Sequence, residues 1–409
     1  MARNQRKPVD PVLSAAAMLR RVGFMLLLMA LPIFAMISRR AVVLIMPIGV
    51  SLIIIAALID GGHRPVGQVN QRFAASPPVL ATLVLAIWIA MSLIWTPYQD
   101  PAINRAISLF ATTALGLAGY YAMPERMRSA NLYLLPIGVA GAAVTGALIA
   151  LATTRGEIPG IAPVALERGM ALAVLAAWPA AAWMHSRGRD AQALTVAAAI
   201  GLMSLLAPSW LPLIAFVAGA LVWGLAASYP RAMTAILATG TAVAIISAPL
   251  FAFIATPLGT GAAGSAIDAL GIWRGIILDD PLRVVTGYGL EAVQRSRMAG
   301  ELPWNAPNSL LFELWYELGI VGAVAIAIGL AGAVRAAARR QPILIPGGLA
   351  CFASAFTFAA FGIASTQMWW ITGLIVIALA FVAVTRGQFR TRRPKMVFPN
   401  RAGVEESTP

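Results

Sequence analysis

The chain has 409 residues, of which 60% are hydrophobic and 11% charged, and its mean hydropathy is +0.81. Soluble domains carry about 25% charged residues, so this composition excludes a water-soluble globular protein and indicates helices packed within a lipid bilayer. The net charge of +14 does not indicate a nucleic-acid partner, because Lys and Arg lie mainly in short segments between apolar runs. Cys351 is the one cysteine, which excludes an intrachain disulfide.

The apolar runs predict an all-α fold, a polytopic transmembrane bundle of about 12 spans, since about 20 apolar residues cross a hydrocarbon core. The basic segment that precedes the first run is interpreted as part of an uncleaved first span. In chain order the predicted spans are Val22–Ile37, Ala41–Ile59, Pro78–Trp95, Ala106–Met123, Leu132–Leu151, Gly169–Met184, Ala191–Leu206, Trp210–Ala227, Ala232–Thr256, Leu311–Val334, Ile343–Ile363 and Met368–Val384.

The same pattern divides the chain into four parts. Residues 1–256 hold the first nine spans, 257–310 form one large loop with short helices, 311–385 hold the last three spans, and 386–409 form a basic tail. An apolar stretch within the loop, Ile267–Leu278, has the helical spacing of a segment that lies at the membrane interface.

The distribution of basic residues predicts the orientation. Most of the 30 Lys and Arg residues fall in alternate connecting segments and in the two ends of the chain, which the positive-inside rule assigns to the cytoplasm. The large loop is then expected on the periplasmic side of a bacterial inner (cell) membrane. The remaining arginines lie on the outer side, and the first two oppose the rule: Arg39, Arg40, Arg105, Arg155, Arg168, Arg274, Arg283, Arg295 and Arg297.

Two of these arginines are candidate ligands for a phosphate group. Arg168 stands at the outer mouth of the sixth span, where it either anchors the helix end or binds a lipid phosphate. Arg274 follows Trp273 and is either a surface charge beside an interfacial aromatic residue or a second phosphate ligand. Asp279 and Asp280 have no partner cluster of His or carboxylates, so a turn or cap is favoured and no metal site is predicted.

A third cluster begins where the large loop returns to the membrane. Asn308 precedes a helix that carries Glu313 and Glu317 four residues apart, and therefore on one face. Carboxylates at membrane depth are costly and indicate function, although pairing with loop arginines for structure is the alternative.

Together these motifs resemble the O-antigen ligase and polymerase superfamily, the integral-membrane glycosyltransferases of bacterial surface polysaccharides. Asn308, Leu311, Glu317, Gly319 and Gly322 fall on the motif that ends that family's large periplasmic loop. Similar family segments correspond to Trp273-Arg274, Pro281-Leu282, Gly287-Tyr288-Gly289, Arg168-Gly169, Trp178-Pro179, Trp95-Thr96-Pro97 and Trp369-Trp370.

The resemblance implies transfer of a glycan from undecaprenyl diphosphate to an acceptor hydroxyl of lipid A-core or a growing polysaccharide, without a cofactor. Arg168 and Arg274 would bind the diphosphate, with Arg105 and Arg155 as weaker candidates. The family histidine would precede Asn308, where this chain has Pro307. The expected catalytic residues are therefore Asn308 and a carboxylate that assists the acceptor, with Glu317 preferred over Glu313.

Two other functions fit the sequence. A secondary transporter or flippase-like carrier would also use about 12 helices, but its charged residues would lie near the midplane rather than in one loop and at helix mouths. A catalytically inactive scaffold in polysaccharide assembly is the third hypothesis, and the missing histidine is its basis. Ligase and polymerase remain undistinguished.

Overall fold

The computed structural model describes residues 11–61, 76–153, 163–254, 264–339, 341–362 and 367–387, and every regular element in these ranges is a helix. The helices are α1 (Pro11–Phe24), η1 (Met25–Ala30), α2 (Leu31–Ala35), α3 (Ala41–Ile59), α5 (Pro77–Ser92), α6 (Gln99–Ala122), α7 (Ser129–Leu132), α8 (Leu134–Thr153), α9 (Pro163–Ser186), α10 (Asp190–Leu205), α11 (Leu211–Ser228), α12 (Pro230–Ile254), α13 (Gly264–Asp279), α14 (Arg283–Thr286), α15 (Ala292–Ala299), α16 (Leu310–Ala337), η4 (Pro342–Leu344), α17 (Ile345–Phe361) and α18 (Met368–Arg386).

Nine helical stretches in the described part are long and apolar enough to cross a membrane, which makes the protein a polytopic helical bundle. They comprise α1–α2, α3, α7–α8, α9, α11, α12, α16, η4–α17 and α18. Three other predicted spans coincide with α5, α6 and α10. The helices α5 and α10 have only 16 residues each, and α6 carries charged residues near its start. The total of 12 spans therefore remains a prediction.

Helix α9 is the central helix of the larger core. It is surrounded by α2, α8, α10, α11, α17 and α18, and every residue from Gly169 to Met184 is buried. Many of these residues are alanine, and such small side chains let neighbouring helices approach closely in lipid. The Trp178 indole has a polar partner in this core: its Nε1 donates to Ser354 Oγ at 2.9 Å, and Ser354 Oγ donates to the Ala215 carbonyl at 2.7 Å.

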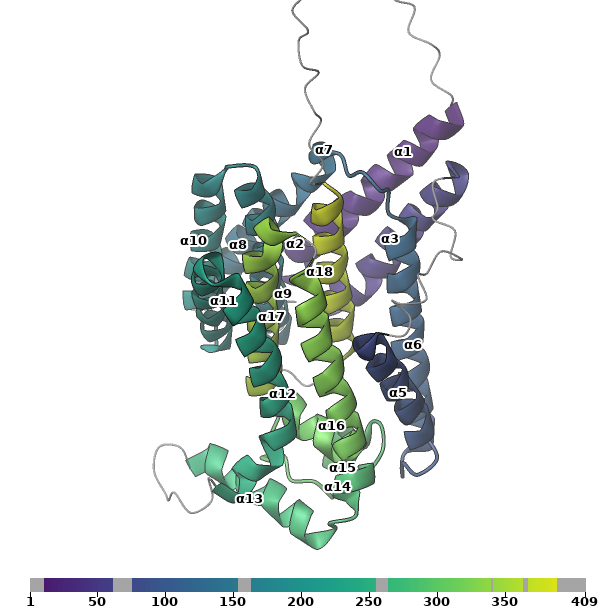
Figure 1. The fold of residues 1–409 in the computed structure, drawn as a ribbon, viewed down its shortest axis with the longest axis vertical. Helices are drawn as coiled ribbons and strands as arrows, with labels where there is room; N and C mark the ends of the chain where they lie inside the picture. Colours follow the sequence, from purple (N-terminus) through teal and green to yellow (C-terminus); the bar gives the residue numbers. More distant parts are fainter. Residues whose placement is uncertain are drawn as a thin grey trace, which may run out of the picture.

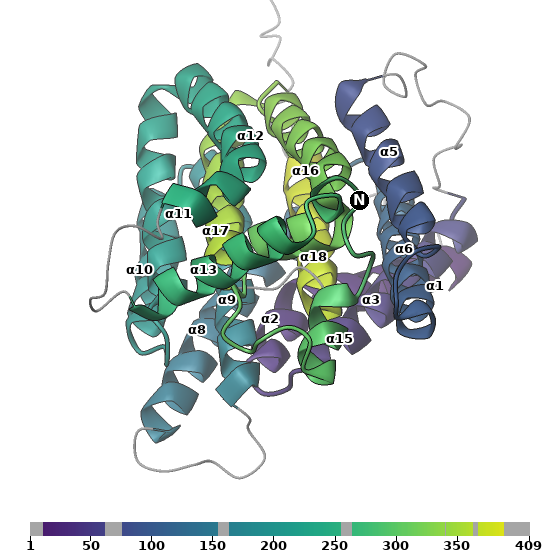
Figure 2. The same ribbon diagram turned by 90° about the horizontal axis from the view of Figure 1, so that it is seen from below.

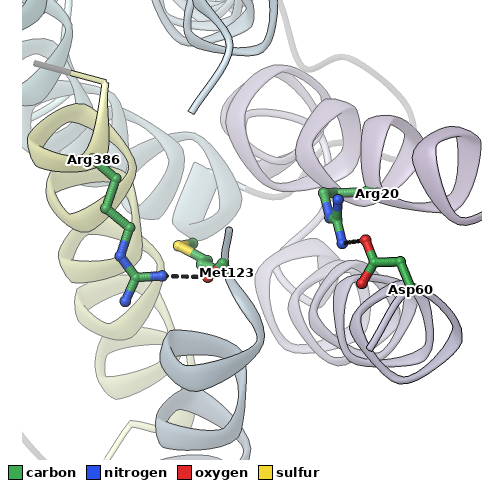
Figure 3. A network of polar contacts seen from close by, with 4 residues as sticks. All are labelled: Arg20, Asp60, Met123 and Arg386. Carbon is green, nitrogen blue, oxygen red and sulfur yellow. Dashed lines mark hydrogen bonds and ion pairs between the residues drawn. The ribbon is translucent and has the colours of Figure 1, made fainter. Parts of the chain in front are cut away.

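The first turn of α1 and the last turn of α18 lie at the same end of the bundle, at the top of Figure 1. Figure 3 shows two contacts that fasten this end: Arg386 Nη1 donates to the Met123 carbonyl at 2.5 Å, and Arg20 of α1 pairs with Asp60 at the end of α3. Arg187 also donates to the Gly387 carbonyl, at 2.7 Å. These basic residues were all predicted to share one side of the membrane, and they share one end of the bundle.

The short helices α13, α14 and α15 lie at the opposite end, at the bottom of Figure 1, between the ends of α12 and α16. Seen from below, α13 and α15 cross the end of the bundle in front of the long helices (Figure 2). The predicted interfacial segment 267–278 lies within α13. The region predicted as one large loop is thus helical over much of its described part and covers one end of the bundle.

Candidate functional site

The site is built around a break in α16 at Gly319. This glycine has φ 61° and ψ −160°, and a Cβ atom there would lie 2.4 Å from the Val285 carbonyl oxygen. Only glycine tolerates this backbone conformation and this close approach. The break separates a short half-helix, residues 310–318, from the longer membrane-spanning half.

Neighbouring segments support the broken backbone. Gly287 and Gly289, which also have positive φ angles, bring a turn against the half-helix, and a Cβ at Gly287 would lie 2.2 Å from the Glu317 carbonyl oxygen. Three carbonyl groups beside the break accept hydrogen bonds from outside α16: Tyr316 O from Tyr288 N at 2.8 Å, Glu317 O from Gly289 N at 2.9 Å, and Leu318 O from Trp88 Nε1 at 2.9 Å. The half-helix therefore has a fixed position relative to the turn.

A cavity of about 770 Å³ lies beside α15 and the start of this half-helix. Five arginines line it: Arg39, Arg40, Arg105, Arg168 and Arg297. The other polar lining side chains are Gln294, Asn308, Glu313 and Gln367, so one carboxylate faces five guanidinium groups. A small cavity with this excess of positive charge favours an anionic ligand.

Most of the lining residues come from the beginnings of five helices, and α15 with the segment after it supplies the rest. Arg39 and Arg40 directly precede α3, Arg105 and Arg168 lie in the second turns of α6 and α9, and Gln367 precedes α18. The start of α16 completes the wall. Helix N-termini carry partial positive charge and unpaired backbone N–H groups, which adds to the attraction of the arginines for an anion.

Arg168 is held in one orientation. Its Nη2 donates to Gln367 Oε1 at 2.7 Å, and its Cζ lies 5.3 Å from the centroid of the Trp369 ring. Trp369 Nε1 donates to the same Gln367 oxygen at 2.6 Å. Next to it, Gly169 lets α9 pack against the end of α2, since a Cβ there would lie 2.7 Å from the Ala35 carbonyl oxygen. The guanidinium is thus fixed before any ligand binds.

Arg297 organises the segment that leads into α16. Its two terminal nitrogens donate to Asn308 Oδ1 at 3.3 Å, to the Pro307 carbonyl at 2.8 Å and to the Ala306 carbonyl at 3.1 Å. Burial lowers the pKa of the Arg297 guanidinium, and the charge of Glu313 opposes that shift. Pro307, where the resemblance would place a histidine, therefore supplies a carbonyl acceptor to Arg297 and no titratable group.

The two candidate carboxylates have different surroundings. Glu313 and Glu317 are both buried, but only Glu313 lines the cavity. Glu317 lies one turn further along the half-helix, and its Oε1 accepts a hydrogen bond from the Val293 N–H at 3.3 Å. The expected preference for Glu317 thus points to the carboxylate behind the wall, while Glu313 is the one that a ligand would meet.

The structure does not bring Arg274 to the cavity. Arg274 is exposed on α13, and its Cζ lies 5.7 Å from the centroid of the Phe253 ring. Its neighbour Trp273 is buried against Phe312, with ring centroids 5.4 Å apart. Adjacent residues on a helix point about 100° apart, so the packing of Trp273 turns Arg274 away. Arg155 lies outside the described residues.

Asp280 forms an ion pair with Arg283, at 3.6 Å between Oδ2 and Nε. Among the described residues, no group of three or more His, Cys, Asp or Glu side chains is arranged to hold a metal ion. Asp280 is thus engaged with a neighbouring arginine.

Three of the cavity arginines were not proposed as ligands from sequence: Arg39, Arg40 and Arg297. A signal for the first two was present, because they oppose the positive-inside rule, and a basic pair retained on the disfavoured side needs another explanation. Arg297 carries no comparable signal, since it resembles any charged residue of an exposed loop.

Chemically, the cavity combines fixed cations, a carboxylate that can accept a proton, and the amide groups of Asn308 and Gln294. This combination suits the binding of a phosphate-containing ligand and the deprotonation of a hydroxyl beside it.

Comparison of the chain with protein-family models, with curated proteins and with solved structures gives no match.

Proposed function

We propose that the protein is a membrane glycosyltransferase of the O-antigen ligase and polymerase type. It transfers a glycan from undecaprenyl diphosphate to an acceptor hydroxyl, on lipid A-core or on a growing polysaccharide, at the periplasmic side of the bacterial inner membrane. The observation that supports this most strongly is the cavity in which five arginines meet one carboxylate, four of the arginines at or near helix N-termini and Arg297 in the last turn of α15. The motifs shared with the family are the second support.

The arginines match the demand of the leaving group. As the bond between the sugar and the diphosphate breaks, negative charge develops on the diphosphate, and donors that are already oriented stabilise it most. Arg168 meets that condition through Gln367 and Trp369. Arg105 lines the same wall, whereas Arg274 lies elsewhere, so we assign the diphosphate to Arg168 and Arg105 first.

The carboxylate matches the demand of the acceptor. The hydroxyl oxygen forms a bond to the anomeric carbon, its proton passes to Glu313, and the diphosphate leaves with the electron pair of the broken bond. Glu313 is preferred over Glu317 because it lines the cavity. Asn308, whose side-chain oxygen is engaged by Arg297, has its NH₂ group left to orient a substrate oxygen.

The direct test is release of undecaprenyl diphosphate by the purified protein in lipid nanodiscs, given an undecaprenyl-diphosphate-linked glycan and an acceptor. A general base contributes about 10²–10⁴-fold, so Glu313→Gln should lose at least a hundredfold in rate. Glu317→Gln, the matched control one turn away, should lose less. Equal activity of both variants and the wild type would exclude the carboxylate mechanism.

If the wild-type protein releases no diphosphate but is needed for polysaccharide assembly in cells, the scaffold hypothesis replaces the enzyme. Movement of the lipid-linked glycan across the bilayer without release would favour the carrier. Loss of lipopolysaccharide or capsule in a deletion strain, seen on gels, is expected for both the enzyme and the scaffold. Release of the diphosphate in vitro separates these two.

The proposed orientation has its own test. A reporter that is active only in the periplasm should be active when fused after Gly300, which ends α15. The same reporter should be silent when fused after Arg340 or at the C-terminus. The reverse pattern would place the cavity in the cytoplasm, where the proposed lipid-linked donor would not be used.

A further inference from the structure

A third buried carboxylate, Glu291, lies behind the cavity wall at the start of α15. Its φ is 68°, and it is the one non-glycine residue with positive φ among those described. Its side chain is buried, and Oε2 has no hydrogen-bond partner. A left-handed conformation at a non-glycine residue is strained, and such strain concentrates at functional sites.

The charged neighbours of Glu291 come from three helices. Arg105 of α6 and Arg295 of α15 attract its carboxylate. Arg105 also attracts two carboxylates of α16, Glu313 and Glu317. The charges of Glu291 and Glu313 in turn repel that of Glu317. Residue Val293, two positions after Glu291, donates its N–H to Glu317, which ties the segment that carries Glu291 to the half-helix. The three carboxylates and Arg105 are therefore one electrostatic unit.

Buried carboxylates that lie close together do not all ionise, because their mutual repulsion and the loss of hydration outweigh the attraction of few cations. Here three carboxylates share Arg105. Arg295 is the further cation that acts on Glu291, and Arg297 is the further cation that acts on Glu313. Burial raises the pKa of Glu291, and Arg105 and Arg295 oppose that shift only in part. Glu291 therefore brings to this unit a proton that it keeps to a higher pH than an exposed glutamate does.

We propose that Glu291, Glu313, Glu317 and Arg105 form a proton-holding cluster, in which Glu313 exchanges the proton with the cavity while Glu291 and Glu317 set the pH at which it does so. Glu291 and Glu317 are positioning residues, since they act through Glu313. The cluster supplies the pH control that a histidine before Asn308 would otherwise give. This role in transfer rests on the proposed function, whereas the shared proton does not.

The shared proton can be measured without any substrate. Infrared spectroscopy of the protein in nanodiscs detects the C=O stretch of protonated carboxyl groups as the pH is raised. In the wild type this band should persist above the pH at which exposed glutamates ionise. Glu291→Gln removes one acid and one source of repulsion, so the remaining band should disappear at lower pH. Arg105→Met removes the shared cation, so the band should persist to higher pH.

Asp279→Asn is the matched control, because Asp279 is exposed at the end of α13 and lies outside the cluster. It should leave the titration of the band unchanged. Identical titrations in the wild type, Glu291→Gln and Arg105→Met would overturn the proposal. Because opposite shifts are expected from the two variants, failure of one of them to fold leaves the other as a complete test.

The rate of transfer provides the second measurement. Ionised Glu313 is needed to accept the proton, so transfer should fall as the pH is lowered through the titration of the cluster. Neighbouring charges shift such titrations by about 1–3 pH units, and the acidic limb should move to lower pH by about one unit in Glu291→Gln. An unmoved acidic limb together with a shifted infrared band would retain the cluster and reject its role in transfer. Absence of transfer in the wild type would reject the proposed function alone.

Discussion

Helices α9 and α16 both reach the cavity with their N-terminal turns, yet they are built in opposite ways. From Gly169 to Met184, α9 is buried and predominantly apolar, and the Trp178 indole donates its hydrogen bond within the core. Helix α16 buries two carboxylates, is broken at Gly319, and depends on Trp88, Tyr288 and Gly289 for hydrogen bonds to its backbone. Packing alone fixes the first, and a set of outside contacts fixes the second.

The difference in packing indicates that the two helices have different roles at the cavity. A helix packed on all sides can hold a charged side chain at its end without adjustment, as α9 does with Arg168. A helix with a break can place two buried carboxylates one turn apart, at the cost of backbone bonds that other segments must supply. We therefore expect changes around α16 to affect both stability and chemistry, and changes within α9 to affect mainly stability.

The largest effect is expected at the break itself. In Gly319→Ala the new Cβ would lie 2.4 Å from the Val285 carbonyl oxygen in a left-handed conformation, so the variant should lose about 2 kcal/mol or more of stability, and transfer with it. Gly329→Ala, further along α16, is the matched control, since the nearest atom is Thr82 Oγ1 at 3.9 Å. Thermal unfolding in detergent that showed equal stability of both variants would contradict the structural role of the break.

The next effect concerns the cation that α9 presents. Loss of a charge-assisted contact to a desolvated phosphate costs about 1.5–3 kcal/mol, so Arg168→Ala should cut transfer about ten- to a hundredfold at normal protein levels. Arg168→Lys should not restore it, because an ammonium group cannot copy the planar fork that contacts Gln367 and Trp369.

Arg274→Ala is the control for that assignment. Its side chain is exposed and stacked on Phe253, so the variant should retain most of the activity. If Arg274→Ala is as inactive as Arg168→Ala, α13 must approach the cavity when the donor binds. Full activity of Arg168→Ala would end the assignment of the diphosphate to this arginine.

The smallest effect compares two indole groups. Trp88→Phe removes the donor to the Leu318 carbonyl beside the break, and Trp178→Phe removes the donor to Ser354 in the α9 core. Each should lower stability by about 1 kcal/mol. Only Trp88→Phe should also slow transfer, because it loosens the half-helix that carries Glu313. The melting temperature and the transfer rate should be measured for both variants. Equal slowing of transfer in the two would contradict the different roles assigned to α9 and α16.

Much of the fold was predictable because apolar runs determine where helices form in lipid. The predicted span at 41–59 matches α3 residue for residue, and the first span was predicted too short, since α1 begins at Pro11. The break in α16 was not predicted, because glycines within an apolar run are also common in continuous transmembrane helices. Only the contact with Val285 reveals why a glycine is required at position 319.

The candidate site was predictable in part. Arg168, Arg105 and Asn308 lie together at the cavity, and the helical spacing placed Glu313 and Glu317 on one face. Which of the two carboxylates meets the cavity depends on the segment that covers them, here through the contact of Val293 with Glu317. Arg274 was a candidate through its place beside Trp273, and the burial of that tryptophan is what directs the arginine outward.

The hydrogen bonds around Gly319 also have a consequence for exchanging parts between related proteins. Tyr288 and Gly289 donate hydrogen bonds to the first half of α16, so residues 283–318 should be exchanged together as one segment. The segment is best joined to the rest of the chain at Gly319. A chimera joined there keeps the Tyr288 and Gly289 donors with their own carbonyls, and its Leu318 carbonyl still meets the host's Trp88. A chimera joined at residue 310 would place a foreign turn against the native half-helix. The turn donors and the carbonyls that accept from them would then come from different proteins. Altered substrate selectivity should therefore transfer with the longer segment.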